Sequence, residues 1–275
     1  MSVYEEMVKW DVIEPIEDKL FSGEFHLKLD EDGKERITIP HIVDQNPKSP
    51  WIFAGVDTER ICLTWFQIYF NTYGIISRNC FNCWKTVCRP QTIDQLFAME
   101  KLQDKLLDEH GFKGKCGLEK RPYGSYKGLY AAFWYNPEGS GGLVEARKRT
   151  KIIEEAVHEE IGPLPVILKR ACTEMEERAG RSNDWVYPKE QDKFEDKLDE
   201  LFDVYSAGIL QTPLIKNHIR RSWLEWGFER GDEEVAKYVD SFPEGFGTTK
   251  TVDYFHSNPV ICSGQVRRGK LGKST

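Results

Sequence analysis

The chain has 275 residues, of which 40% are hydrophobic and 30% are charged, and its formal net charge is −7. This length suits one large domain or two small ones with a buried core, and the composition is ordinary for a globular protein. No segment approaches the roughly 18 apolar residues of a membrane span, and the acidic N-terminus lacks the positive region of a secretion signal. We therefore expect a cytoplasmic protein that does not enter a membrane.

The first 76 residues predict an N-terminal extension of short strands followed by a buried helix. Residues 25–29 and 36–39 have strand character and are separated by an acidic turn that contains a glycine. Asp57 and Thr58 can cap a helix that runs to about residue 73, with a broad apolar face typical of a buried helix.

Residues 77–172 show the most regular alternation of elements in the chain. Strands are predicted at 84–89, 115–121, 128–135 and 165–169, and helices at 93–110 and 143–161. The resulting order, βαββαβ, is that of the ferredoxin-like fold, an α+β arrangement with an antiparallel sheet. The segment 173–275 predicts a helical elaboration that ends in a flexible, basic, glycine-containing tail. Its helices are expected at 173–180, 192–205, 213–229 and 232–239.

Seven cysteines in a reducing compartment are expected to be free thiols or metal ligands. Cys80 and Cys83 form a C-x2-C pair, a spacing that lets two thiolates bind one tetrahedral ion from a turn. In a ferredoxin-like sheet, the starts of the first and second strands and the end of the fourth share one edge. That edge would bring Cys116 and Cys172 to the pair, so a four-thiolate zinc site is predicted, with an iron–sulfur cluster as the alternative. Without the metal, the pair would be small buried residues.

Only the middle segment has more basic than acidic residues. Lys85 and Arg89 share one face of the first strand because their spacing is even. Further basic residues lie on or beside the other strands, namely Lys115, Lys120, Arg121, Lys127, Lys169 and Arg170. A basic patch on an acidic chain implies an anionic ligand such as nucleic acid or a phosphate-bearing small molecule, although these residues could equally be a solvated rim paired with carboxylates.

The third strand is rich in aromatic residues. It loosely resembles the aromatic third strand of RNA-recognition domains, with Leu129 standing where an aromatic residue is usual. The resemblance implies that Phe133 and Tyr135 stack bases on the open face of the sheet, while Tyr130 and Trp134 face the helices. The opposite orientation, or a purely structural role in the core, is the alternative.

No catalytic residue is identified, since the six histidines are scattered and phosphate-binding and nucleophile-elbow motifs are absent. The sequence therefore predicts a metal-stabilised binding protein for nucleic acid or a phosphate-bearing ligand. The first alternative is an enzyme on nucleotides or nucleic acid that uses an iron–sulfur cluster or a reactive Cys172, a residue between Arg170 and Glu174. The second is a virion-type assembly protein that meets a protein partner through its C-terminal helices.

Overall fold

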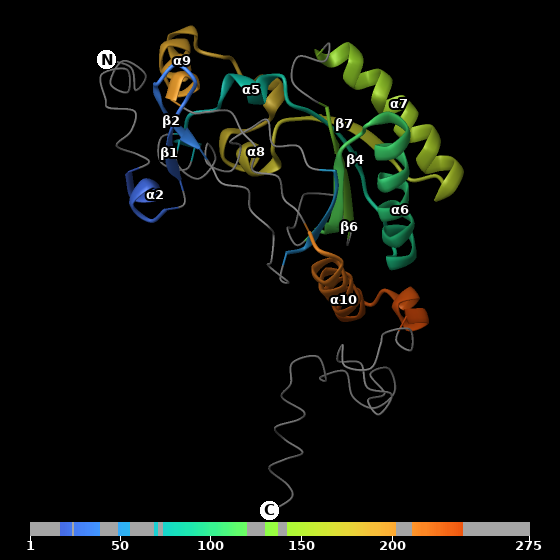
Figure 1. Ribbon diagram of the computed structural model, residues 1–275. Coiled ribbons are helices and arrows are strands. Elements are labelled where there is room, and N and C mark those ends of the chain that lie inside the picture. Colours follow the sequence, from blue (N-terminus) through green and yellow to red (C-terminus); the bar gives the residue numbers. More distant parts are fainter. Residues whose placement is uncertain are drawn as a thin grey trace, which may run out of the picture.

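The computed structural model describes residues 17–23, 25–38, 49–55, 69–70, 74–119, 130–136, 142–201 and 211–238 (Figure 1). These residues form a mixture of helices and antiparallel sheets, so the protein is of the α+β class. Within them, no helix combines the length and the apolar character that crossing a membrane would need.

The centre of the molecule is a five-stranded sheet in which every neighbouring pair is antiparallel. Its order is β3-β5-β6-β4-β7, so β6 lies between β5 and β4, and β7 lies at the edge beside β4. The strands are β3 (Trp51–Ala54), β4 (Trp84–Cys88), β5 (Gly114–Leu118), β6 (Tyr130–Tyr135) and β7 (Val166–Arg170).

Strand β3 is not among the strands that the sequence predicts. It comes from the expected N-terminal extension and pairs with β5, with Trp51 opposite Gly117 and Ala54 opposite Gly114. Gly117 permits this pairing, because a Cβ atom there would overlap the carbonyl oxygen of Pro50. The sheet therefore draws strands from both sides of the boundary expected at residue 76.

One face of the sheet is covered by the two long helices, α6 (Ile93–His110) and α7 (Gly142–Glu160) (Figure 1). Helix α6 begins where the Thr92 side chain accepts a hydrogen bond from the Gln95 amide, and it ends at Gly111, which has a φ of 68°. Between the helices and the sheet lies the main hydrophobic core, which includes Ile93, Leu96, Met99, Leu102, Cys116, Tyr130, Trp134, Ile153 and Val157.

The C-terminal helix α10 (Pro213–Glu229) and the 3-10 helix η5 (Glu233–Tyr238) extend this core beside β3 and β5. The indole of Trp223 is fully buried and donates a hydrogen bond to the Pro50 carbonyl over 2.9 Å. Helix α10 has the predicted bounds. The helix expected at 232–239 is instead the shorter 3-10 helix η5.

Short elements lie on the other side of the sheet (Figure 1). They include α5 (Arg78–Phe81), α8 (Thr173–Ala179), α9 (Asp192–Leu201) and the hairpin of β1 (His26–Leu29) with β2 (Glu35–Thr38). The remaining pieces are α2 (Glu17–Phe21), η3 (Ser182–Asp184) and η4 (Lys189–Gln191). The hairpin confirms the two strands predicted near the N-terminus. Most of the helix expected at 57–73, and the basic tail, lie outside the described residues.

Candidate functional site

The face of the sheet that points away from α6 and α7 carries a set of aromatic and basic side chains. Strand alternation decides which residues belong to it. Thr86 hydrogen bonds with Thr150 of α7 over 2.7 Å, which marks the helix-covered face. Its neighbours Lys85 and Val87 therefore point to the other face. We call this the aromatic–basic face and define it by Trp51, Phe53, Lys85, Arg89, Lys115, Phe133 and Tyr135.

The register of the sheet arranges these residues in rows that cross the strands. In one row, Val87 lies opposite Phe133, Phe133 opposite Lys115, and Lys115 opposite Phe53. In the next row, Lys85 lies between Tyr135 and Lys169. Directly opposite residues in an antiparallel pair are close enough for their side chains to touch. Lys115 therefore lies between two rings in the first row, and Lys85 lies between a ring and a second lysine in the next.

Lys115 is the residue with the most aromatic neighbours. Its Nζ lies 4.6 Å from the ring centroid of Trp51, 5.7 Å from that of Phe133, 5.9 Å from that of Phe53 and 6.0 Å from that of Tyr135. Phe133 is buried, whereas the other three rings are partly exposed. Within the described part of the chain, no carboxylate forms an ion pair with Lys115. Cation–π attraction thus holds an ammonium group whose charge is not otherwise neutralised there.

Lys85 is a buried lysine with a sulfur partner. Its side chain is 8% exposed, its Nζ donates a hydrogen bond to the Sγ of Cys172 over 3.0 Å, and it lies 5.4 Å from the Tyr135 ring centroid. Burial acts to lower the pKa of Lys85, but Cys172, Cys83 and Tyr135 outweigh it and hold that pKa well above its ordinary value. Lys85 therefore stays protonated at neutral pH.

The other predicted basic residues are engaged by neighbours. Arg89 forms an ion pair with Glu119 over 3.0 Å and lies 5.8 Å from the ring centroid of Phe133. Lys169 pairs with Glu176. Arg170 lies over the rings of Phe81 and Trp84, in each case 5.9 Å from the centroid. Lys120 and Arg121 lie outside the described residues.

Strand β6, the third strand of the predicted ferredoxin-like order, has the first of the two orientations that the sequence analysis considered. Phe133 and Tyr135 are on the aromatic–basic face, while Tyr130 and Trp134 are buried against the helices. Sequence reasoning did not include Trp51 and Phe53, because β3 was not recognised as a strand. The run of four apolar residues in Trp51–Ala54 was the signal available.

The structure separates Cys116 from the other three cysteines predicted to bind a metal, and Cys172 packs against the cluster that contains Cys80. Cys116 is the third residue of β5, points into the helix-covered core and is fully buried, and burial raises the pKa of its thiol well above the ordinary value. Both Cys116 and Cys88 are paired with Ala132 of β6, so Cys116 lies level with the end of β4 that is far from Cys83. Cys80 packs in a different hydrophobic cluster, beside Ala171 and Met175. The expected convergence with Cys116 is therefore not found.

Cys83 and Cys172 do lie close together. The amide of Ala171 donates a hydrogen bond to the carbonyl of Cys83 over 2.8 Å. The pairing of β4 with β7 therefore continues one residue beyond Trp84 and Arg170. Across the described ranges, no group of three or more histidine, cysteine, aspartate or glutamate residues is placed to hold a metal ion. Cys116 lies apart from Cys83 and Cys172 because it is two residues beyond the start of β5 and points to the helix-covered face of the sheet.

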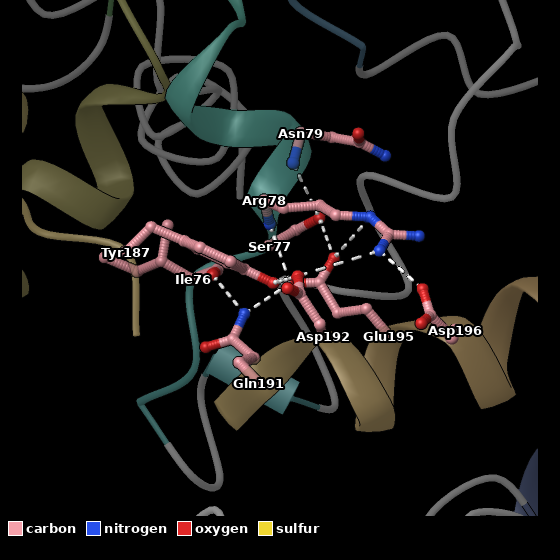
Figure 2. Close-up of polar contacts among 9 residues, drawn as sticks. All are labelled: Ile76, Ser77, Arg78, Asn79, Tyr187, Gln191, Asp192, Glu195 and Asp196. Atoms are coloured by element: carbon pink, nitrogen blue, oxygen red, sulfur yellow. Dashed lines mark hydrogen bonds and ion pairs between the residues drawn. The ribbon is translucent and has the colours of Figure 1, made fainter. Parts of the chain in front are cut away.

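Helix α9 fixes the turn that contains Cys80 and precedes Cys83. The buried carboxylate of Glu195 accepts hydrogen bonds from the Arg78 amide over 2.7 Å and from the Ser77 hydroxyl over 3.1 Å, and also from the Gln191 side chain. The Arg78 guanidinium reaches Asp196 at 2.6 Å (Figure 2). Burial raises the pKa of Glu195 despite these donors.

No protein-family model matches the chain, and no match is found among curated proteins or solved structures.

Proposed function

We propose that this protein binds nucleic acid, or another ligand that joins phosphate groups to planar rings, through the aromatic–basic face. The observation that carries the proposal is Lys115, whose ammonium forms no ion pair among the described residues and lies 4.6 to 6.0 Å from four ring centroids of β3 and β6, the two strands beside β5. Phosphates bind cations and bases stack on aromatic rings, so this combination supports recognition of both parts of a nucleotide.

The three partly exposed rings suit a ligand with only a few stacked bases. Each base that stacks on an aromatic side chain contributes about 1–3 kcal/mol. A phosphate beside Lys115 would gain a charge-assisted hydrogen bond, which is stronger than the cation–π contact it would replace. Lys85 adds a second positive charge one row away. The face is therefore suited to short, single-stranded segments.

We further infer that residues 84–170 form a ferredoxin-like core. The support is the strand arrangement, with β6 between β5 and β4, β7 beside β4, and both long helices on one face. In such an arrangement the second face of the sheet is left for other elements or for ligands. This likeness concerns the fold alone, and the functional proposal depends on the side chains of the face.

Bound zinc, with an iron–sulfur cluster as the alternative, stays a prediction, as does the cytoplasmic location. The proposed function depends on neither. The alternative of an enzyme that uses Cys172 has one observation in its favour, the 3.0 Å contact between Cys172 and Lys85.

The test is binding of a fluorescently labelled single-stranded oligonucleotide, followed by anisotropy at several salt concentrations. We expect binding that weakens with salt and strengthens with oligonucleotide length up to a few bases. Lys115→Ala should weaken it several-fold and lower the salt slope by about 0.7 if one phosphate contact is lost. The matched control is Lys151→Ala on the opposite side of the molecule, in α7, which removes the same charge and should leave affinity unchanged.

The same assay distinguishes a nucleic-acid ligand from a small phosphate-bearing ligand. A mononucleotide that competes as well as the oligonucleotide would identify a small-molecule site. Absence of binding at low salt, or equal losses in Lys115→Ala and Lys151→Ala, would contradict the proposal.

A further inference from the structure

At the edge of the aromatic–basic face, Lys85 lies beside two cysteines that the binding proposal does not use. Lys85 lies in the middle of this group, with its Nζ 3.0 Å from the Sγ of Cys172. Among the described residues no carboxylate forms an ion pair with Lys85. A buried ammonium needs a compensating partner, and here that partner is the sulfur of Cys172.

The local backbone places Cys83 next to Cys172. Cys83 is opposite Ala171, as the 2.8 Å hydrogen bond between them shows. Opposite Cα atoms in an antiparallel pair lie about 4.5–5.5 Å apart. Cys172 directly follows Ala171, where a φ of 57° turns the chain out of the strand, and both Cys172 and Cys83 act electrostatically on the Lys85 ammonium. Both thiols therefore lie around the same lysine, an adjacency that allows the Cα separation of roughly 4.4–6.8 Å that a disulfide needs.

Solvent exposure distinguishes Cys83 and Cys172 from the other cysteines that the structure describes. Cys83 and Cys172 are partly exposed, whereas Cys88 and Cys116 are fully buried and Cys80 is buried among apolar side chains. An oxidant in solution reaches partly exposed sulfurs first, and the Lys85 ammonium lies 3.0 Å from the Sγ of Cys172.

We propose that Cys172 and Cys83 are an oxidation-sensitive thiol pair, in which Cys172 reacts with hydrogen peroxide and Cys83 closes a disulfide. This site shares Lys85 with the aromatic–basic face, but its oxidation requires no bound ligand. It also accounts for why a buried lysine on β4 faces a cysteine instead of a carboxylate.

The chemistry takes two steps. The Cys172 thiolate attacks one oxygen of hydrogen peroxide, the O–O bond breaks, and the sulfur becomes a sulfenic acid while the departing hydroxide takes up a proton to become water. The Cys83 thiol then attacks the oxidised sulfur, the S–O bond breaks, and a second water leaves. Both sulfurs are oxidised to a disulfide, and peroxide is the only oxidant consumed. The Lys85 ammonium stabilises the attacking thiolate.

The experiment treats the reduced full-length chain with stoichiometric hydrogen peroxide and maps the products by mass spectrometry without reduction. We expect a Cys83–Cys172 disulfide as the main product. Cys83→Ser should stop the reaction at a Cys172 sulfenic acid that a cyclic diketone captures. Cys172→Ser should remove both products, and Cys88→Ser, the matched control, should change neither.

The role of Lys85 is tested by rate. Peroxide should oxidise Cys172 in the native chain at least several-fold faster than in the urea-unfolded chain, and Lys85→Met should lose most of that advantage. The comparison of native with unfolded wild type requires no variant to fold. Equal rates in the two states, a disulfide between another pair, or oxidation spread evenly over the cysteines would each overturn the proposal.

Discussion

The phenol of Tyr130 in β6 donates a hydrogen bond to the carboxylate of Asp232, which lies between α10 and η5, over 2.7 Å. The same carboxylate oxygen accepts the amide of Ile93 at the start of α6 over 2.6 Å. Asp232 is buried, so three elements far apart in the sequence meet at one carboxylate. Its hydrogen bonds raise the pKa of Tyr130, in addition to the effect of burial, which is the largest cause.

Removal of this carboxylate should destabilise the protein. We expect Asp232→Ala to lower the free energy of unfolding by about 1–3 kcal/mol, because the buried donors of Tyr130 and Ile93 lose their partner. Tyr130→Phe removes one donor and leaves the Ile93 hydrogen bond, so it should cost less, about 1 kcal/mol. Urea unfolding of both variants measures the difference. Equal losses would show that the Ile93 contact contributes nothing.

Gly117 should tolerate no side chain. A Cβ atom there would overlap the backbone carbonyl of Pro50, and backbone moves less easily than the end of a side chain. We expect Gly117→Ala to cost about 1–3 kcal/mol and to loosen β3, which contributes Trp51 and Phe53 to the aromatic–basic face. Thermal unfolding gives the loss, and hydrogen exchange on the β3 amides locates it. Lys151→Ala, in α7 on the other face of the sheet, is the control and should leave β3 protection intact.

Cys116 should be irrelevant to any bound metal. It points into the helix-covered core, whereas Cys83 and Cys172 lie beside Lys85. We expect Cys116→Ser to leave the zinc or iron content of the purified protein unchanged, as measured by elemental analysis. The same variant should lose about 1–3 kcal/mol of stability, since a hydroxyl replaces a thiol in an apolar site. Loss of metal in Cys116→Ser, with Cys88→Ser unaffected, would instead support the four-thiolate site.

The buried thiols should be protected from alkylation in the folded state. Burial raises the pKa of Cys88 to about 12, so at pH 8 almost none of it is thiolate. We expect iodoacetamide to label Cys88 and Cys116 only after unfolding, and to label Cys83 and Cys172 in the native chain. Peptide mapping after timed labelling distinguishes the two classes. Rapid native labelling of Cys88 would contradict the packing of β4 against the helices.

Glu195 should make stability depend on pH in an unusual direction. Burial raises its pKa in the folded state above the ordinary value of 4.5, so the folded protein binds a proton more tightly than the unfolded chain does. The contribution of this group to stability therefore falls as pH rises from the unfolded pKa through the folded one. We therefore compare the unfolding free energies of wild type and Glu195→Gln between the folded and unfolded pKa values of Glu195. As the pH is lowered through this range, the unfolding free energy of wild type should rise relative to that of Glu195→Gln.

The local elements were predictable from the sequence because their signals are local. The caps of α6 at Thr92 and Gly111, the bounds of α10 and the hairpin near the N-terminus all follow from capping residues, apolar periodicity and turn residues. Alternation along β6 also predicted that Phe133 and Tyr135 share one face and Tyr130 and Trp134 the other, but it left open which pair faces the helices. These properties depend on residues only a few positions apart.

The composition of the candidate site depended on contacts between distant segments. Strand β3 has only four residues and joins the sheet because Gly117 lets it approach β5, so no local pattern placed Trp51 and Phe53 beside Lys115. In the same way, the start of one strand decided that Cys116 is buried away from the other cysteines, since one or two residues of register change both the face and the level of a side chain. The sequence by itself determined the helices and strands with strong local signals and the chemical types of the side chains. The tertiary structure decided that Lys115 contacts four rings and that Lys85 contacts Cys172. These contacts depend on how distant segments pack and pair, which neighbours in the chain do not decide.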